Sequence, residues 1–194
     1  MIERYNVIGI IGNRGDGKTN LAVKFLYDYY TMGRPIIANI WLAPEYFDYI
    51  KLTLDMLLKL PESINHAVIL IDELQKWADA YKFFSKDSLA LSTLFTQLRK
   101  RKLTVIYTTQ DFSTIAKRLR GQTDYIVEMK HLNAWDNKGN YVDGFSKATV
   151  HDARELEGRS LLLQFQHDGR PYFDMYDTNE VVLGREEMEE EELE

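Results

Sequence analysis

The chain of 194 residues contains no cysteine, only four prolines and no long hydrophobic run. Without cysteine it forms no disulfide, zinc–thiolate site or thiol nucleophile, and it suits a reducing compartment. Apolar runs such as Ala67–Ile71 are far shorter than the roughly 20 residues that a membrane-spanning helix needs. The start, Met1–Arg4, lacks the pattern of a secretory signal. We therefore expect neither an integral membrane protein nor a secreted disulfide scaffold.

The negative charge is concentrated at the C-terminal end. The formal net charge is −6, but the tail Glu186–Glu194 alone holds seven of the 30 acidic residues. The rest carries 23 acidic against 24 basic residues and is close to neutral. Such a tail is typical of a disordered, solubilising end, and docking on a basic surface is the alternative. A near-neutral body still permits nucleic-acid binding, because local basic patches attract the polyanion.

Short apolar strands alternate with helical segments over the first two thirds of the chain. Strands are predicted at Tyr5–Ile11, Ile36–Trp41, His66–Ile71, Leu103–Thr108 and Asp124–Met129, and helices at Thr19–Thr31, within Pro44–Leu60 and at Asp87–Arg99. The last third favours β-hairpins, one at the turn Asn137–Asn140 and one that pairs Leu161–Phe165 with Tyr172–Tyr176.

These patterns predict an α/β fold with a mostly parallel central sheet flanked by helices and additional β-hairpins in the C-terminal third. We expect a single domain over residues 1–185, with a core at about 5–130 and a β-rich extension at 131–185. The acidic tail at 186–194 follows it.

A glycine-rich loop lies between the first strand and the first helix. Gly12–Thr19, hereafter the phosphate loop, reads GNRGDGKT and fits GxxxxGK[ST] in every fixed position. Glycine permits the backbone to wrap a phosphate, and the next helix presents its positive end to the same anion. The motif predicts a P-loop NTPase that binds ATP and Mg²⁺, with Lys18 on the β- and γ-phosphates and the Thr19 hydroxyl on the metal. The expected phosphate-binding residues are Gly12, Asn13, Arg14, Gly15, Asp16, Gly17, Lys18, Thr19 and Asn20.

Two later strands end in polar side chains at the edge where the phosphates would lie. Val68–Ile71 runs into Asp72, a predicted Mg²⁺ ligand, and Glu73, a predicted general base. Adjacent carboxylates favour water activation and hence NTP hydrolysis, whereas an acidic helix cap is the alternative. Gln110 follows the strand at Leu103–Thr108 and is a candidate sensor of the γ-phosphate, with an ordinary polar turn as the alternative.

The phosphate loop, the Asp72–Glu73 pair and Gln110, in that order, resemble the FtsK–HerA superfamily of DNA-pumping ATPases. Within it, the segment Leu98–Gln110 most resembles the genome-packaging ATPases of turreted icosahedral viruses of Sulfolobus. The resemblance covers about residues 5–130, and none is identified beyond Lys130. It implies a five-stranded ATPase core, a homo-oligomeric ring, and ATP-driven translocation of double-stranded DNA into a preformed capsid.

The resemblance also implies site residues and partners. Lys18, Thr19, Asp72, Glu73 and Gln110 keep the roles given above, and an arginine finger from the neighbouring subunit matches Arg99 or Arg101, between which the sequence does not decide. A capsid or internal-membrane protein is the implied docking partner. The implied location is the cytoplasm of the infected host cell, with attachment to the virion at the packaging vertex as an extension of it.

Other interpretations stay open. Lys76–Lys86 interleaves lysines with aromatic residues and could contact the DNA backbone, although an amphipathic segment with solvated lysines explains it as well. Lys117–Arg120 is a second basic cluster with the same ambiguity; Arg118 and Arg120 within it are weaker finger candidates.

Two other functional classes are alternatives to the DNA translocase. A nucleotide-switched assembly protein, similar to the Zot-like morphogenesis proteins of filamentous phages, is the second functional class. Those proteins typically carry a membrane segment. A host-type DNA-transfer ATPase is the third.

Overall fold

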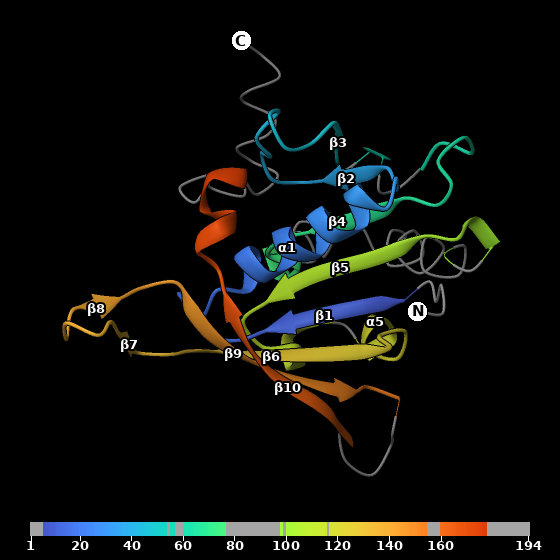
Figure 1. Cartoon of the computed structure of the whole chain (residues 1–194). Coiled ribbons are helices and arrows are strands. Elements are labelled where there is room, and N and C mark those ends of the chain that lie inside the picture. The colour runs from blue at the N-terminus through green and yellow to red at the C-terminus, as the bar shows by residue number, and fades with distance from the viewer. Residues whose placement is uncertain are drawn as a thin grey trace.

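The computed structural model describes residues 6–53, 55–56, 60–76, 98, 100–115, 117–154 and 160–177. Its main sheet has eight strands in the order β10-β9-β6-β1-β5-β4-β2-β3 (Figure 1). Their bounds are β1 Val7–Ile11, β2 Ile36–Ala38, β3 Tyr49–Lys51, β4 Val68–Ile71, β5 Thr104–Thr109, β6 Tyr125–His131, β9 Phe145–Asp152 and β10 Ser160–Asp168. Neighbours from β6 to β3 are parallel, whereas β9 and β10 are antiparallel.

The strands β4 and β5 form the centre of the core, because every residue in both is buried. Helix α1 (Lys18–Thr31) lies across the sheet in Figure 1 and packs its apolar side, with Leu21, Ala22 and Leu26, against β1, β4 and β5. Strands buried on both faces read as continuous apolar runs, which is the pattern of Val68–Ile71.

Shorter elements complete the described part. After β5 come η1 (Phe112–Thr114) and α5 (Lys117–Arg120), and after β10 comes η2 (Arg170–Met175). A small hairpin of β7 (Ala134–Trp135) and β8 (Tyr141–Val142) projects from the body between β6 and β9 (Figure 1).

The predicted fold class is confirmed, but two local predictions are wrong. Part of Pro44–Leu60, expected to be helical, forms the edge strand β3, because Tyr49–Lys51 pairs with β2 in parallel register. This gives six parallel strands in the described sheet, one more than the resemblance implied. The segment Tyr172–Tyr176, expected to be a strand, lies mostly in η2, where Pro171 occupies the first turn, a position that suits a residue without an N–H.

The C-terminal extension is joined to the core sheet through β9. Strand β9 pairs with β6 along its length, and β10, expected to pair with Tyr172–Tyr176, pairs with β9 instead. Beyond β10, the chain returns across α1, where the Ala43 N–H donates to the Met175 carbonyl and Leu42 bridges Tyr176. The extension thereby reaches the carboxyl edge of the parallel strands, where the phosphate loop lies.

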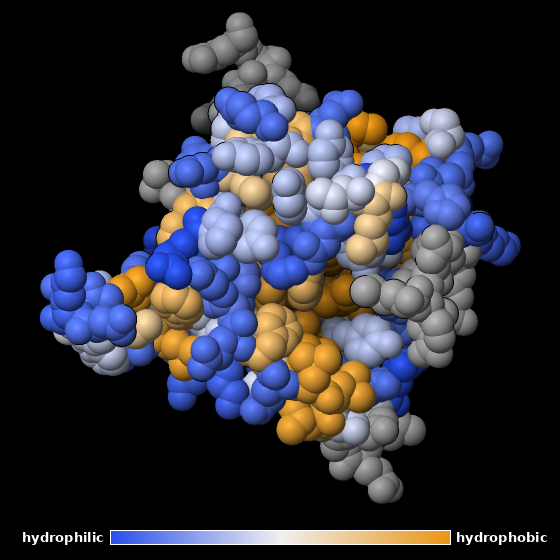
Figure 2. Space-filling model, in the orientation of Figure 1, coloured by the Kyte–Doolittle hydropathy of each residue, from blue (hydrophilic) through white to orange (hydrophobic). Residues whose placement is uncertain are grey.

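The surface is uneven in character. Figure 2 shows hydrophobic surface gathered toward the β9–β10 end of the sheet, whereas the area over α1 is mostly hydrophilic. The exposed apolar side chains there include Leu161, Leu162 and Leu163 of β10.

Two predicted segments lie outside the described residues. They are the helix Asp87–Arg99, apart from Leu98, and the acidic tail.

We expect Gly9→Ala to destabilise the fold by about 2 kcal/mol, because it overpacks the centre of the sheet. A Cβ at Gly9 would lie 2.6 Å from the Tyr107 hydroxyl oxygen and 2.7 Å from Cζ. Adding Tyr107→Val opens this space, so the double variant should lose less stability than the sum of the two single variants. Urea unfolding of all four proteins measures this coupling, and additive losses would contradict the packing.

Candidate functional site

The phosphate loop connects β1 to α1 with a backbone that requires glycine at its ends. Gly12 and Gly17 have φ angles of 155° and 84°, outside the range that other residues readily adopt. Space is also limited, since a Cβ would lie 2.7 Å from the Met129 carbonyl oxygen at Gly12 and 2.8 Å from the Ser146 hydroxyl at Gly17. The motif glycines therefore let β6 and β9 approach the loop closely.

Asp16 holds the loop in this shape. Its carboxylate accepts the N–H of Asn13 at 2.6 Å and the N–H of His131, at the end of β6, at 3.0 Å. The Ser146 hydroxyl, at the start of β9, donates to the Asp16 carbonyl at 2.9 Å. The sequence placed Asp16 among the phosphate-binding residues; in the structure its hydrogen bonds tie the loop to the extension.

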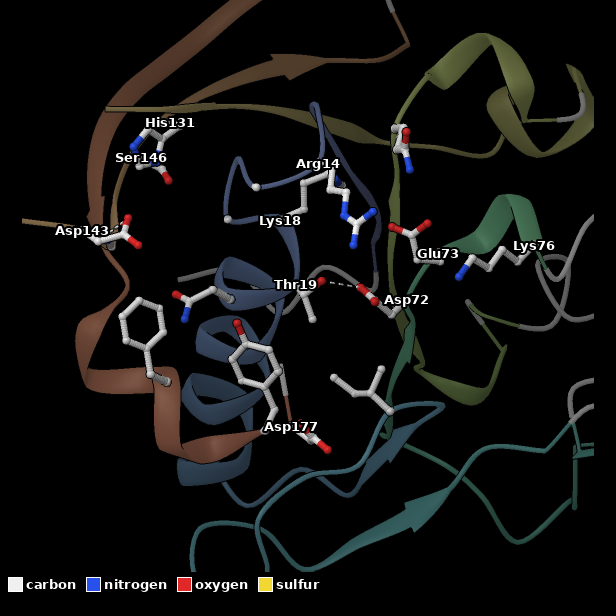
Figure 3. A pocket seen from close by; sticks show the side chains of 18 residues that line it. Arg14, Lys18, Thr19, Asp72, Glu73, Lys76, His131, Asp143, Ser146 and Asp177 are labelled. Atoms are coloured by element: carbon white, nitrogen blue, oxygen red, sulfur yellow. Dashed lines mark hydrogen bonds between the residues drawn. The ribbon is translucent and has the colours of Figure 1, made fainter. Parts of the chain in front are cut away.

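Lys18 and Thr19 begin helix α1 and point to the centre of the site (Figure 3). The Lys18 ammonium donates to the Asn13 carbonyl at 2.9 Å, which keeps it over the loop, and its side chain is buried. The Thr19 hydroxyl donates to Asp72 Oδ1 at 2.9 Å. The first turn of α1 contains no acidic residue, so its positive end stays available to an anion.

Asp72 is a buried carboxylate at the carboxyl end of β4. Its Oδ1 accepts hydrogen bonds from Thr19 and from Thr108 at 2.7 Å, while the Asn39 amide binds both its N–H and its carbonyl. Burial raises the pKa of Asp72 and the Glu73 charge adds to this, although the two hydroxyls and Lys18 oppose it. The negative charge at Asp72 is therefore incompletely compensated.

The donor set around Asp72 suits a hard divalent cation. Mg²⁺ prefers oxygen ligands and typically uses one or two carboxylates together with substrate phosphates. Asp72 and Thr19 supply one carboxylate and one hydroxyl within hydrogen-bonding distance of each other. Within the described residues no group of three or more His, Asp or Glu side chains forms a metal site by itself, so phosphate oxygens would have to complete the coordination.

Glu73 is held in a left-handed backbone conformation, with φ at 52°. Such a conformation is unfavourable for a residue with a side chain and is enriched at functional sites. His66 and Lys102, which do not line the pocket, adopt it as well. Its N–H donates to the Thr108 hydroxyl at 2.9 Å, and its carboxylate accepts a hydrogen bond from Gln75. This turn directs the Glu73 carboxylate into the pocket beside Asp72 (Figure 3).

The remaining predicted residues divide between two edges of the sheet. Gln110 follows β5, is exposed and lines the pocket with Glu73. Arg101 lies before β5, at the opposite edge, where its guanidinium donates to the backbone carbonyls of Leu60, Pro61 and Ile64. It therefore does not reach the site of its own chain.

The other arginine candidates lie partly outside the described residues. Arg99 lies outside the described residues, and so does the side chain of Arg118. The guanidinium of Arg120 lies 6.0 Å from the ring centre of Phe112. Of the proposed DNA-contacting segment Lys76–Lys86, only Lys76 is described, and it lines the pocket.

A cavity of about 790 Å³ is lined by part of the predicted set together with several residues that the sequence did not indicate. The predicted residues that line it are Arg14, Gly15, Gly17, Lys18, Thr19, Asn20, Asp72, Glu73 and Gln110, whereas Gly12, Asn13 and Asp16 are not among its lining residues. The loop, Asp72, Glu73 and Gln110 form one part of it. The extension forms the other part, for which no sequence motif gave a signal, with His131, Asp143, Gly144, Ser146, Phe173, Tyr176 and Asp177.

Asn20 joins α1 to the extension. Its amide nitrogen donates to the Gly169 carbonyl at 3.1 Å, and its oxygen lies 2.7 Å from His167 Nε2. The His167 ring stacks on Tyr172 of η2, with 5.9 Å between ring centres. Asn20 was predicted to bind the nucleotide; it lines the pocket, and its hydrogen bonds fix the start of η2.

We expect Asp72→Asn to stabilise the protein without nucleotide or Mg²⁺ by about 1 kcal/mol at neutral pH, because it removes a buried charge. Because the pKa of Asp72 is raised on folding, the folded state holds its proton more tightly than the unfolded state. The advantage of the variant should therefore shrink as pH falls through that raised pKa. Urea unfolding at several pH values measures it, with the exposed Asp48→Asn as control. An Asp72→Asn protein less stable than wild type at pH 7 would contradict this account.

Burial lowers the pKa of His167, and the nearby charge of Lys24 lowers it further. Folding therefore disfavours the protonated ring, and stability should fall as pH drops below the ordinary value of about 6.5. We expect His167→Gln to be less stable than wild type at pH 7.5, with a difference that narrows by pH 5.5. Chemical unfolding across this range tests it; a constant difference would show that His167 does not titrate with folding.

Comparisons with known proteins agree with this architecture. The zonular occludens toxin N-terminal domain from Neisseria meningitidis superimposes with a TM-score of 0.56 at 19% identity, covering 89% of this chain and 98% of that one. The genome packaging NTPase B204 from Sulfolobus turreted icosahedral virus 2, solved with ATP-gammaS, gives 0.51 at 14% identity, covering 83% and 98%. At these identities the likeness shows the fold alone. No curated protein matches the sequence.

The family comparison extends further along the chain than the motifs do. The family described as zonular occludens toxin (Zot) matches residues 7–178, which include the extension beyond Lys130. The sequence motifs favoured the packaging ATPases over the Zot-like proteins, partly because Zot-like proteins typically carry a membrane segment. The solved Zot structure is itself an N-terminal domain, so the membrane segment does not distinguish the two groups here. Among the described residues, no helix has the length and apolarity needed to cross a membrane. The match spans most of the sequence, and the chain belongs to the Zot family.

Proposed function

We propose that the chain is a Mg²⁺-dependent ATPase that drives DNA translocation during virus morphogenesis. The observation that carries the hydrolytic part is Glu73, whose carboxylate is directed into the phosphate-loop pocket by a strained backbone. A carboxylate directed at the phosphate-loop pocket in this way has the placement that a general base requires. The packaging role is supported by the likeness of the fold to a genome packaging NTPase.

Each residue of the site has a distinct task in this proposal. The loop and Lys18 bind the β- and γ-phosphates. Thr19 and Asp72 would hold Mg²⁺, which would supply positive charge beside the phosphate oxygens. Glu73 accepts a proton from the attacking water, and Gln110 orients that water or detects the γ-phosphate. The Thr108 hydroxyl binds the Asp72 carboxylate and the Glu73 backbone N–H, and so holds the Asp72 side chain beside the backbone of the proposed base.

The proposed motor also requires neighbouring subunits and DNA. We propose a homo-oligomeric ring in which Arg99 or Arg101 acts on the adjacent subunit. For Arg101, this requires exchange of its bonds to the 60–64 turn for contact with the neighbour's phosphate. Double-stranded DNA would pass along basic residues, of which Lys76 lies at the pocket. A capsid or internal-membrane protein is the proposed docking partner in the infected cell.

A second candidate is an assembly protein switched by nucleotide binding without turnover. Membership of the Zot family favours it, because this chain resembles the Zot-like morphogenesis proteins in its phosphate loop. The two candidates differ in one measurable property, which is whether bound ATP is hydrolysed.

We expect steady-state ATP hydrolysis that depends on Mg²⁺ and rises with long double-stranded DNA. Glu73→Gln should lower kcat by roughly 10²- to 10⁴-fold, the usual contribution of a general base, while ATP binding is kept. Glu45→Gln changes an exposed glutamate away from the pocket and should behave as wild type. Phosphate release and calorimetric binding measure both quantities.

The outcomes separate the candidates. Turnover stimulated by DNA and abolished in Glu73→Gln supports the motor. Tight ATP binding with no turnover above the Glu73→Gln level, with or without DNA, contradicts it and favours the switch.

A further inference from the structure

The pocket has two distinct ends. Glu73, Lys76 and Gln110 line the end beyond Asp72, whereas Asp143, Gly144 and Phe173 line the end made by the extension. Figure 3 shows Asp143, His131 and Ser146 on one side of the loop and Asp72, Glu73 and Lys76 on the other. If the γ-phosphate faces Glu73, the nucleoside must leave the loop on the Asp143 side.

Phe173 lies at this nucleoside end with an incompletely covered ring. The side chain is 40% exposed although it faces a pocket lined largely by polar residues. One part of the ring packs on Gly144, where a Cβ would come within 3.0 Å of Cζ and 3.2 Å of Cε2. An aromatic ring that is supported from one side and open toward a nucleotide pocket is suited to stacking.

The support of Phe173 comes from both ends of η2. At the start, the Gly169 N–H donates to the Gly144 carbonyl at 2.7 Å, and Asn20 binds the Gly169 carbonyl. At the end, the Met175 carbonyl accepts the Ala43 N–H at 2.9 Å. The two ends of η2 are therefore held by contacts to the residue before β9, to α1 and to the segment after β2, which is the arrangement expected of a preformed site.

We propose that Phe173 is the stacking platform for the nucleotide base, so that η2 completes a nucleoside triphosphate site. The inference rests on the proposed nucleotide binding and adds the subsite for the base. Stacking depends on ring area and not on the hydrogen-bonding edge of the base. ATP and GTP should therefore bind about equally, and both should bind more tightly than CTP.

Calorimetry with ATPγS and with inorganic tripolyphosphate, both with Mg²⁺, tests the subsite. Phe173→Ala should weaken ATPγS binding roughly tenfold and leave tripolyphosphate binding unchanged, because only the former has a base to stack. Phe173→Tyr keeps the ring and should restore binding. Trp135→Ala removes an exposed aromatic ring of the β7–β8 hairpin, outside the pocket, and should have no effect.

The wild-type protein provides a test that does not depend on the folding of a variant. It should bind ATPγS at least several-fold more tightly than tripolyphosphate. Equal affinities, or an unchanged ATPγS affinity in folded Phe173→Ala, would overturn the base subsite while leaving the proposed function intact. Failure of both ligands to bind wild type would overturn the proposed function as well.

Discussion

The hydrogen bonds of Asp16 are the constraint on which the site depends. They close the phosphate loop on itself through Asn13 and fasten it to β6 and β9 through His131 and Ser146. A loop rich in glycine has many conformations, so its phosphate-binding shape must be imposed from outside. Here, the end of β6 and the start of the antiparallel strand β9 impose it. The extension is thus part of the proposed nucleotide site, and the match of the Zot family through residue 178 is consistent with a shared unit.

Two features that are unfavourable for stability lie at the carboxyl edge of the parallel strands. Asp72 is a buried charge with a raised pKa, and Glu73 adopts a left-handed backbone. The Thr108 hydroxyl donates to the Asp72 carboxylate and accepts the backbone N–H of Glu73, which holds the Asp72 side chain and the Glu73 backbone close together. A cation and a phosphate chain would relieve the first feature, and a reaction that needs a directed carboxylate explains the second. The free energy that these two features cost the fold is consistent with a site whose ligand stabilises the folded state on binding.

The sequence predicted the parts of the site that are local in the chain. The phosphate loop and the Asp72–Glu73 pair are short motifs whose spacing fixes their geometry. Asn39 and Phe173 act through contacts with residues distant in sequence, and no local pattern marks them. Likewise, Tyr49–Lys51 became a strand because β2 offered a free edge, a tertiary effect that overrides helical spacing. The proposed arginine finger would act on a neighbouring subunit, which a single sequence does not describe.

Hydrogen–deuterium exchange with and without Mg²⁺ and ATPγS tests most directly whether the loop and the extension form one nucleotide site. The account predicts slower exchange on binding in three places: the loop and start of α1, the Asp72–Glu73 turn, and the extension at residues 143–146 and 169–177. Protection confined to the loop and the Asp72–Glu73 turn would contradict the claim that the extension completes the site.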